Sequence, residues 1–295
     1  MGQGLIVQWG ATSRLQRFWD IRAAFNFIGG GAGSGLLVWA ALGYFAGLPF
    51  WPAALAGLLF IAGGLLMVWL EIGRPWRAFR VFFRPQTSWM TREGIVALPL
   101  FVTGAAAVLI DAGVRLPLGS PPVAMLITAF LSLVFLYCQL RILRSSRGLP
   151  AWRESRVTPL LGLSGLAEGL GVYLLLTAFV ATLPVFMLAA ALVLIVARAI
   201  AWHFYVSALH HAEVPESTVN VLRALHRRFL AIGHGLPVAL IGLTFVWPDL
   251  TAPLLALAGI TAALGGWLLK AVLVTRAAYI PKYSIPAAPV RGQPG

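Results

Sequence analysis

The chain contains very little cysteine and little charge of any kind. Cys138 is the single cysteine in 295 residues, so the chain forms no internal disulfide and no four-cysteine iron–sulfur site of its own. Charged residues make up 11% of the sequence and hydrophobic residues 60%, and the mean hydropathy is +0.87. A water-soluble domain of this size needs more charge on its surface. The composition therefore predicts a membrane protein.

Common catalytic motifs and acidic residues are also scarce. The sequence has no GxGxxG, P-loop, HExxH or CxxC pattern, which excludes soluble catalytic domains of those kinds. Nine acids accompany 22 Lys and Arg, for a net charge of +13. The basic residues flank apolar runs, so we expect no nucleic-acid partner. We also expect no cleavable signal peptide, because Arg14, Arg17 and Arg22 precede the first long apolar run.

Long apolar runs dominate the rest of the chain. A helix needs roughly 20 apolar residues to cross about 30 Å of hydrocarbon. Such a helix is in contact with membrane lipid. Eight segments are long enough, which predicts an all-α polytopic membrane domain over residues 1–278 and an extended tail over 279–295. The first four and the last four are also compatible with two four-helix bundles. The segments are Phe25–Ala46, Trp51–Ile72, Ile95–Val114, Pro122–Leu140, Thr158–Ala181, Pro184–Tyr205, Phe229–Trp247 and Ala252–Val272.

The basic residues lie on alternate connections. Twenty of the 22 Lys and Arg fall at the two termini or after the second, fourth and sixth segments. Arg115 lies on the other side, and Arg198 lies within a segment. Because cytoplasmic loops carry the excess of Lys and Arg, both termini are predicted to lie in the cytoplasm. The expected location is the inner (cytoplasmic) membrane.

One connection, Trp69 to Gly94, combines aromatic, basic and acidic residues more densely than any other stretch. It carries five arginines, and it is bracketed by Glu71 and Glu93. An ordinary cytoplasmic loop is also basic by topology and aromatic at the level of the lipid headgroups. The two acids are the unusual feature, because the whole chain has only nine. This connection is therefore the first candidate for a functional site.

Ionisable residues inside a span are costly unless they are paired or hydrated. Glu168 lies near the middle of the fifth segment and Arg198 lies in the sixth, so we expect them to pair. The alternative is that Glu168 belongs to a proton path. His203, Tyr205, His234, Lys270 and Glu71 are expected near the cytoplasmic interface.

Haem and metal sites are weakly indicated. His203 and His234 lie in different segments without the further helix histidines that membrane haem proteins usually have. His210, His211, Glu213 and His226 are spread over a loop without metal-ligand spacing. We expect no haem and no metal in this chain.

Two motifs within the Trp69–Gly94 stretch carry a family resemblance. Leu70 to Phe79 reads LEIGRPWRAF, and Ser88 to Glu93 reads SWMTRE. With eight segments in 295 residues, the chain resembles the DmsC and NrfD-like membrane anchors of molybdopterin oxidoreductases. In that family a Leu–His–Leu–Gly–x–Pro–x–Arg–Ala–Phe run precedes Ser–x–x–Ser–x–Glu. Glu71 replaces the histidine implicated with quinol, and Glu93 retains the glutamate.

The resemblance implies a function. Such an anchor holds an iron–sulfur (ferredoxin-like) subunit, which in turn holds a molybdopterin catalytic subunit with molybdenum or tungsten. Electrons then pass between the cluster and a membrane quinone, menaquinone or ubiquinone. A quinone site needs an apolar slot, hydrogen-bond donors and a protonatable group. We assign Glu71, Glu93 and His234 to proton transfer. We assign quinone binding to Arg77, Trp89, Arg92, His203 and Tyr205.

The side of the membrane on which the Trp69–Gly94 loop lies indicates where the partner enzyme is. The five arginines of this loop indicate that it lies in the cytoplasm. We therefore expect a cytoplasmic partner enzyme, of the sulfite dehydrogenase or phenylacetyl-CoA:acceptor oxidoreductase type. A transporter or permease is one alternative, although the segments show no matched pair of broken helices. A structural anchor without quinone is the other.

Overall fold

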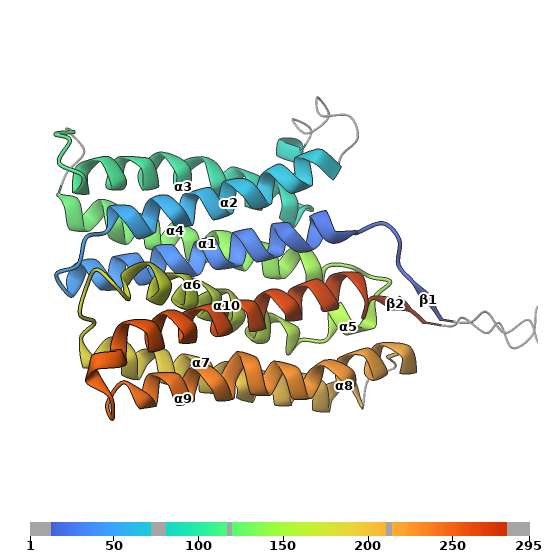
Figure 1. Cartoon of the computed structure of the whole chain (residues 1–295). Coiled ribbons are helices and arrows are strands. Elements are labelled where there is room, and N and C mark those ends of the chain that lie inside the picture. Colours follow the sequence, from blue (N-terminus) through green and yellow to red (C-terminus); the bar gives the residue numbers. More distant parts are fainter. Residues whose placement is uncertain (1–12, 72–80, 117–119, 211–213, 282–295) are drawn as a thin grey trace, which may run out of the picture.

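The chain folds as an all-α, multi-pass membrane protein. The computed structural model describes residues 13–71, 81–116, 120–210 and 214–281. The long helices run side by side with nearly parallel axes (Figure 1). Within the described residues, seven single helices are long and apolar enough to cross a membrane. They are α1 (Ile21–Phe45), α2 (Trp51–Glu71), α3 (Trp89–Asp111), α4 (Pro121–Arg144), α6 (Val157–Thr177), α7 (Val185–Leu209) and α10 (Thr251–Thr275).

The seventh predicted segment is a helix divided by a turn of π-helix. It consists of α8 (Glu216–Leu230), η2 (Ala231–Gly235) and α9 (Leu236–Leu243). Pro237 has no N–H to offer to the carbonyl of Gly233 one turn earlier, which disturbs the helical ladder there. The Gly233 carbonyl instead accepts a hydrogen bond from Arg198. The shorter elements are β1 (Arg14–Leu15), α5 (Pro150–Arg153), η3 (Pro248–Leu250) and β2 (Tyr279–Ile280).

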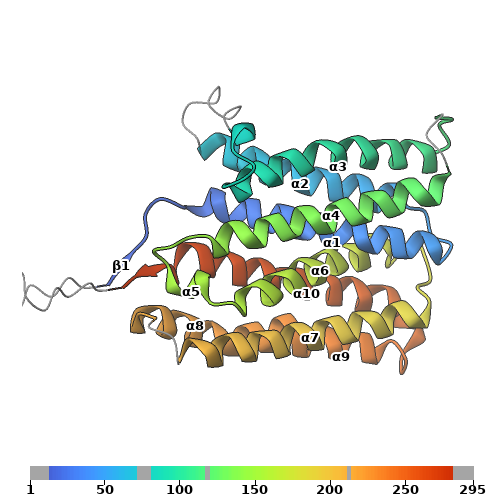
Figure 2. The same ribbon diagram turned by 180° about the vertical axis from the view of Figure 1, so that it is seen from behind.

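Helix α1 lies at the centre of the bundle. It packs against α2 and α4 on one side and against α6 and α10 on the other. Figures 1 and 2 agree that α2 and α3 form one edge of the bundle, while α7, α8 and α9 form the opposite edge. Helices can approach this closely where small residues meet. A Cβ on Gly29 or Gly33 would overlap the α2 backbone, and one on Gly35 would overlap Gly165 of α6.

The two ends of the bundle differ. At one end β1 and β2 pair antiparallel and bring the two termini of the described chain together, beside α5 (Figure 1). The basic connections return to this end. At the other end Asp111, the last residue of α3, accepts hydrogen bonds from the backbone N–H groups of Phe50 and Trp51 at 2.8 and 2.9 Å. That carboxylate satisfies donors at the start of α2.

A fully buried ion pair lies beside α1. Lys270 Nζ of α10 is 2.7 Å from Glu168 Oε2 of α6, and it also donates to the Phe27 carbonyl of α1 at 2.8 Å. The pair fits because Gly31 and Gly266 have no side chains: a Cβ on either would collide with it. The predicted partner of Glu168, Arg198, was therefore wrong. Arg198 lies on α7 and donates to residues of η2 and α10, whereas Lys270 reaches the Glu168 carboxylate.

This ion pair generates a prediction about stability. Glu168→Gln and Lys270→Met should each destabilise the protein by about 3–5 kcal/mol, because each leaves an uncompensated buried charge. The double variant should regain most of that loss, because it removes both charges together. Thermal unfolding of the four proteins in one detergent measures the cycle. Additive losses in the double variant would contradict the coupling.

Candidate functional site

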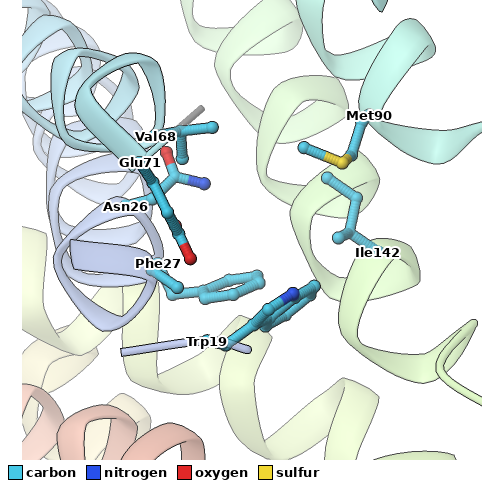
Figure 3. A pocket seen from close by; sticks show the side chains of 8 residues that line it. Trp19, Asn26, Phe27, Val68, Glu71, Met90 and Ile142 are labelled. Atoms are coloured by element: carbon cyan, nitrogen blue, oxygen red, sulfur yellow. The ribbon is translucent and has the colours of Figure 1, made fainter. Parts of the chain in front are cut away.

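A cavity of about 170 Å³ opens at the end of the bundle where the termini meet. Its lining comes from the segment before α1 and from four helices, α1 to α4. Figure 3 shows Glu71 reaching from α2 over Phe27, with Met90 and Ile142 on the facing wall. The lining residues are Trp19, Ala23, Asn26, Phe27, Val68, Glu71, Met90 and Ile142. We call this cavity the Glu71 pocket.

The floor of the Glu71 pocket is aromatic and firmly held. The Trp19 ring stacks on Phe27 with centroids 5.8 Å apart, and it lies 5.0 Å from the Trp152 ring. Gln16 fixes this segment, because its side-chain oxygen accepts from the Trp19 N–H at 2.8 Å. The Gln16 amide nitrogen donates to the Val274 carbonyl of α10 at 3.0 Å. An aromatic surface held in this way suits a planar ring.

The rim of the pocket is charged. Asp20 caps the start of α1 by accepting from the Arg22 N–H at 2.8 Å. The Arg22 guanidinium, hydrogen-bonded to the same carboxyl, holds the pKa of Asp20 below its usual value. Arg22 also donates to the Leu70 carbonyl at 3.1 Å, next to Glu71. The half-buried Glu71 carboxyl thus lies beside an ionised acid and a guanidinium.

A second carboxyl lies behind the pocket. Helix α3 begins at Trp89, capped by Ser88, so Glu93 is part of a helix and not of the preceding loop. Glu93 is only 4% exposed, and the side-chain amides of Asn26 and Gln139 face its carboxyl. Gln139 lies directly over Gly30 and donates to the Asn26 carbonyl at 3.1 Å. Asn26 therefore connects the pocket wall with Glu93.

Trp89 and Arg92 contact each other beside the pocket, and neither residue lines it. The guanidinium of Arg92 lies 4.1 Å from the Trp89 ring centroid, and that of Arg141 lies 4.7 Å from it. Such cation–π contacts fix the ring in place. Arg92 also donates to the Pro85 carbonyl at 2.7 Å. Arg77, the other arginine assigned to quinone binding, lies outside the described residues.

His234 lies in a different part of the bundle from Glu71. It is 5% exposed within the π-turn, and its Nε2 accepts from Arg198 Nε at 3.0 Å. Its Nδ1 lies 2.9 Å from the Phe229 carbonyl, which makes Nδ1 the protonated nitrogen. Arg198 donates further to the Ala262 carbonyl at 3.0 Å. The ring of His234 serves as an acceptor for a buried guanidinium.

His203 and Tyr205 are also separate from the Glu71 pocket. Both lie on α7, at the edge of the bundle opposite α2 and α3 (Figure 2). His203 is exposed, whereas Tyr205 is fully buried and donates to the Ala151 carbonyl at 3.0 Å. The structure thus brings Glu71 and Glu93 together around Asn26. It does not bring the predicted histidines or Tyr205 to them.

Sequence reasoning missed the residues that shape the pocket. Trp19 lies outside the predicted segments, and the polar residues predicted to matter inside the spans were all ionisable or aromatic. Asn26 and Gln139 are amides within apolar segments, and a buried amide needs partners almost as strictly as a charge does. That rule would have selected both residues.

No family model matches the chain, and no curated protein matches it. Within the described residues, no three His, Cys, Asp or Glu side chains come together in a way that could hold a metal ion.

The two histidines provide a matched test of these assignments. His234→Ala should lower the free energy of unfolding by about 1–3 kcal/mol, because a buried guanidinium N–H loses its acceptor. His203→Ala should change it by less than about 0.5 kcal/mol, because the side chain is exposed. Thermal unfolding in detergent measures both. Equal effects would contradict the structural role of His234.

Proposed function

We propose that the chain is the membrane anchor and quinone-interacting electron-transfer subunit of a molybdenum or tungsten oxidoreductase. The observation that carries this proposal is the Glu71 pocket. It combines an aromatic floor, an apolar facing wall, a carboxyl at the rim and an amide next to a second carboxyl. These are the groups that a quinone ring with two carbonyl oxygens needs.

The size of the pocket supports a single ring. A protein cavity of about 150 Å³ holds benzene, and the Glu71 pocket has about 170 Å³. The quinone ring would lie on Trp19 and Phe27, with Met90 and Ile142 above it. The Asn26 side chain is placed to donate to one carbonyl oxygen. Ubiquinone has one such ring and menaquinone has two fused rings, so the size of the pocket fits the ubiquinone ring better, while both offer two carbonyl oxygens to Asn26 and Glu71.

Reduction of a quinone consumes two electrons and two protons. In this proposal the Glu71 carboxyl gives a proton to one carbonyl oxygen and regains it from the aqueous end of the pocket. Arg22 and Asp20 keep that end polar. Glu93, whose carboxyl faces the Asn26 side chain, is the second proton donor, and the Asn26 amide positions the ring without carrying a proton itself. Oxidation of a quinol uses the same groups as acceptors.

The proposed partners dock at the basic end of the bundle. An iron–sulfur subunit on that end would bring a cluster close to the pocket, and a molybdopterin subunit would bind on the iron–sulfur subunit. By the charge rule for loops this end faces the cytoplasm, in an inner membrane. The partner enzyme is then cytoplasmic, of the sulfite dehydrogenase or phenylacetyl-CoA:acceptor oxidoreductase type.

A variant of Glu71 tests the proposal. The complex is isolated from native membranes through a tag on this chain, and iron and molybdenum or tungsten are measured in it. Glu71→Gln should keep the complex assembled, because the amide and the carboxyl have similar volumes. It should slow quinone turnover by about 10²–10⁴-fold, the usual contribution of an acid–base group. Turnover with an artificial acceptor at the iron–sulfur subunit should be unchanged.

Glu216→Gln is the matched control. Glu216 is exposed at the start of α8, on the edge of the bundle away from the pocket, so its loss should affect neither activity. An isolated complex without iron and without molybdenum or tungsten would contradict the anchor role. Unchanged quinone turnover in Glu71→Gln would contradict the proton-transfer role. A purely structural anchor would show the metals but no quinone turnover.

A further inference from the structure

Two arginines contact one aromatic ring at the basic end of the bundle. Trp89 is the first residue of α3, and Arg141 lies in the last turn of α4. The Arg92 guanidinium lies 4.1 Å from the Trp89 ring centroid, and the Arg141 guanidinium lies 4.7 Å from it. Tyr137 completes the group, because its hydroxyl accepts from Arg141 at 3.3 Å and its ring meets Trp89 edge-on. We call these four residues the Trp89 cluster.

The Trp89 cluster has an excess of positive charge. Among the described residues, no ion pair includes Arg92 or Arg141. Glu93 follows Arg92 in the sequence, but its buried carboxyl faces the amides of Asn26 and Gln139. Two like charges repel each other, more strongly where water is scarce, and contact with an aromatic face offsets only part of that cost. A bound anion would neutralise the rest.

The cluster is continuous with exposed apolar surface on α3 and α4, which pack against each other (Figure 2). Residues three or four positions apart lie on the same face of a helix, so each arginine heads a stripe of exposed side chains. The stripes are Ile95, Pro99 and Val102 below Arg92, and Tyr137, Leu133 and Phe130 below Arg141. Val102 is 70% exposed and Phe130 is 65% exposed. Both stripes therefore face membrane lipid.

A phospholipid matches both parts of this surface. Guanidinium groups bind phosphate oxygens through charge-assisted hydrogen bonds, and Trp and Tyr side chains lie at the level of the headgroups. The acyl chains of the same molecule would lie along the apolar stripes. A headgroup with a net negative charge fits best, because the ammonium group of a zwitterionic headgroup would meet two guanidinium groups. Basic pockets between spanning helices bind anionic headgroups in this way.

We propose that the Trp89 cluster is a binding site for an anionic phospholipid, whose phosphate is bound by Arg92 and Arg141. This function is additional to quinone chemistry and does not rest on it. Met90 and Ile142, the neighbours of Trp89 and Arg141 in the sequence, line the facing wall of the Glu71 pocket. The lipid therefore binds the two helix ends that carry this wall.

The test uses the delipidated full chain in micelles with equal amounts of phosphatidylglycerol and phosphatidylethanolamine that have the same acyl chains. Native mass spectrometry measures how much of each lipid the chain retains. The wild type should prefer phosphatidylglycerol. Arg141→Gln should lower the affinity for it about fivefold, and Arg92→Gln/Arg141→Gln about thirtyfold, as expected for one and two arginines near anionic lipid. Arg141→Gln should fold, because Arg141 donates to the hydroxyl of Tyr137, a residue that is 45% exposed.

Arg223→Gln/Arg227→Gln is the matched control. It removes the same charge from exposed positions on α8, at the opposite edge of the bundle, and should keep the wild-type affinity. Arg141→Lys should lose less affinity than Arg141→Gln, because an ammonium group still pairs with phosphate. Thermal unfolding checks that each variant is folded.

Three results would overturn the proposal. The first is equal affinity of the wild type for the two lipids. The second is a loss in the α8 control as large as the loss in Arg92→Gln/Arg141→Gln. The third is displacement of the lipid by excess inorganic phosphate, which would show that a free anion and not a lipid occupies the cluster. Quinone is absent from all of these measurements, so none of the results bears on the Glu71 pocket.

Discussion

The burial of α1 among four other helices is the constraint on which the rest of the structure depends. Its glycines make this possible, because they let neighbouring backbones approach and leave room for foreign side chains. Gln139 lies over Gly30 and Lys270 over Gly31. Each of these polar groups then hydrogen-bonds to a backbone carbonyl of α1, at Asn26 and Phe27. The glycines that allow close packing of α1 thus also allow buried polar side chains to lie against it.

The same helix sets the position of the Glu71 pocket. Ala23, Asn26 and Phe27 are the α1 residues of its lining, and the segment before α1 adds Trp19. The hydrogen bond from the Gln16 side chain to the Val274 carbonyl attaches that segment to α10. The aromatic floor therefore contacts both the first and the last spanning helix. A site built on such anchored elements keeps its geometry, which is what proton transfer to a bound ring requires. The proposed quinone chemistry would require such a fixed geometry.

The sequence predicted the spans well and the buried contacts poorly. Seven of the eight segments became single helices with ends shifted by a few residues, because length and hydropathy are properties of one helix alone. Glu71 was selected from the sequence because a carboxylate at the end of an apolar run stands out, and it lines the pocket. Which side chains meet depends on how the helices pack, and a single sequence does not contain that information. Glu168 therefore received the wrong partner, and His234 was grouped with Glu71 although it accepts from Arg198.

We propose that a quinone ring binds between Trp19 and Met90 beside Glu71. Photolabelling with an azidoquinone in native membranes, followed by mass spectrometry of peptides, tests it most directly. We expect label on the peptides that contain Trp19 to Phe27 and Val68 to Glu71, and we expect that label to disappear when unmodified quinone is added in excess. Label confined to the outer faces of α7 and α9, or label that excess quinone does not displace, would contradict it.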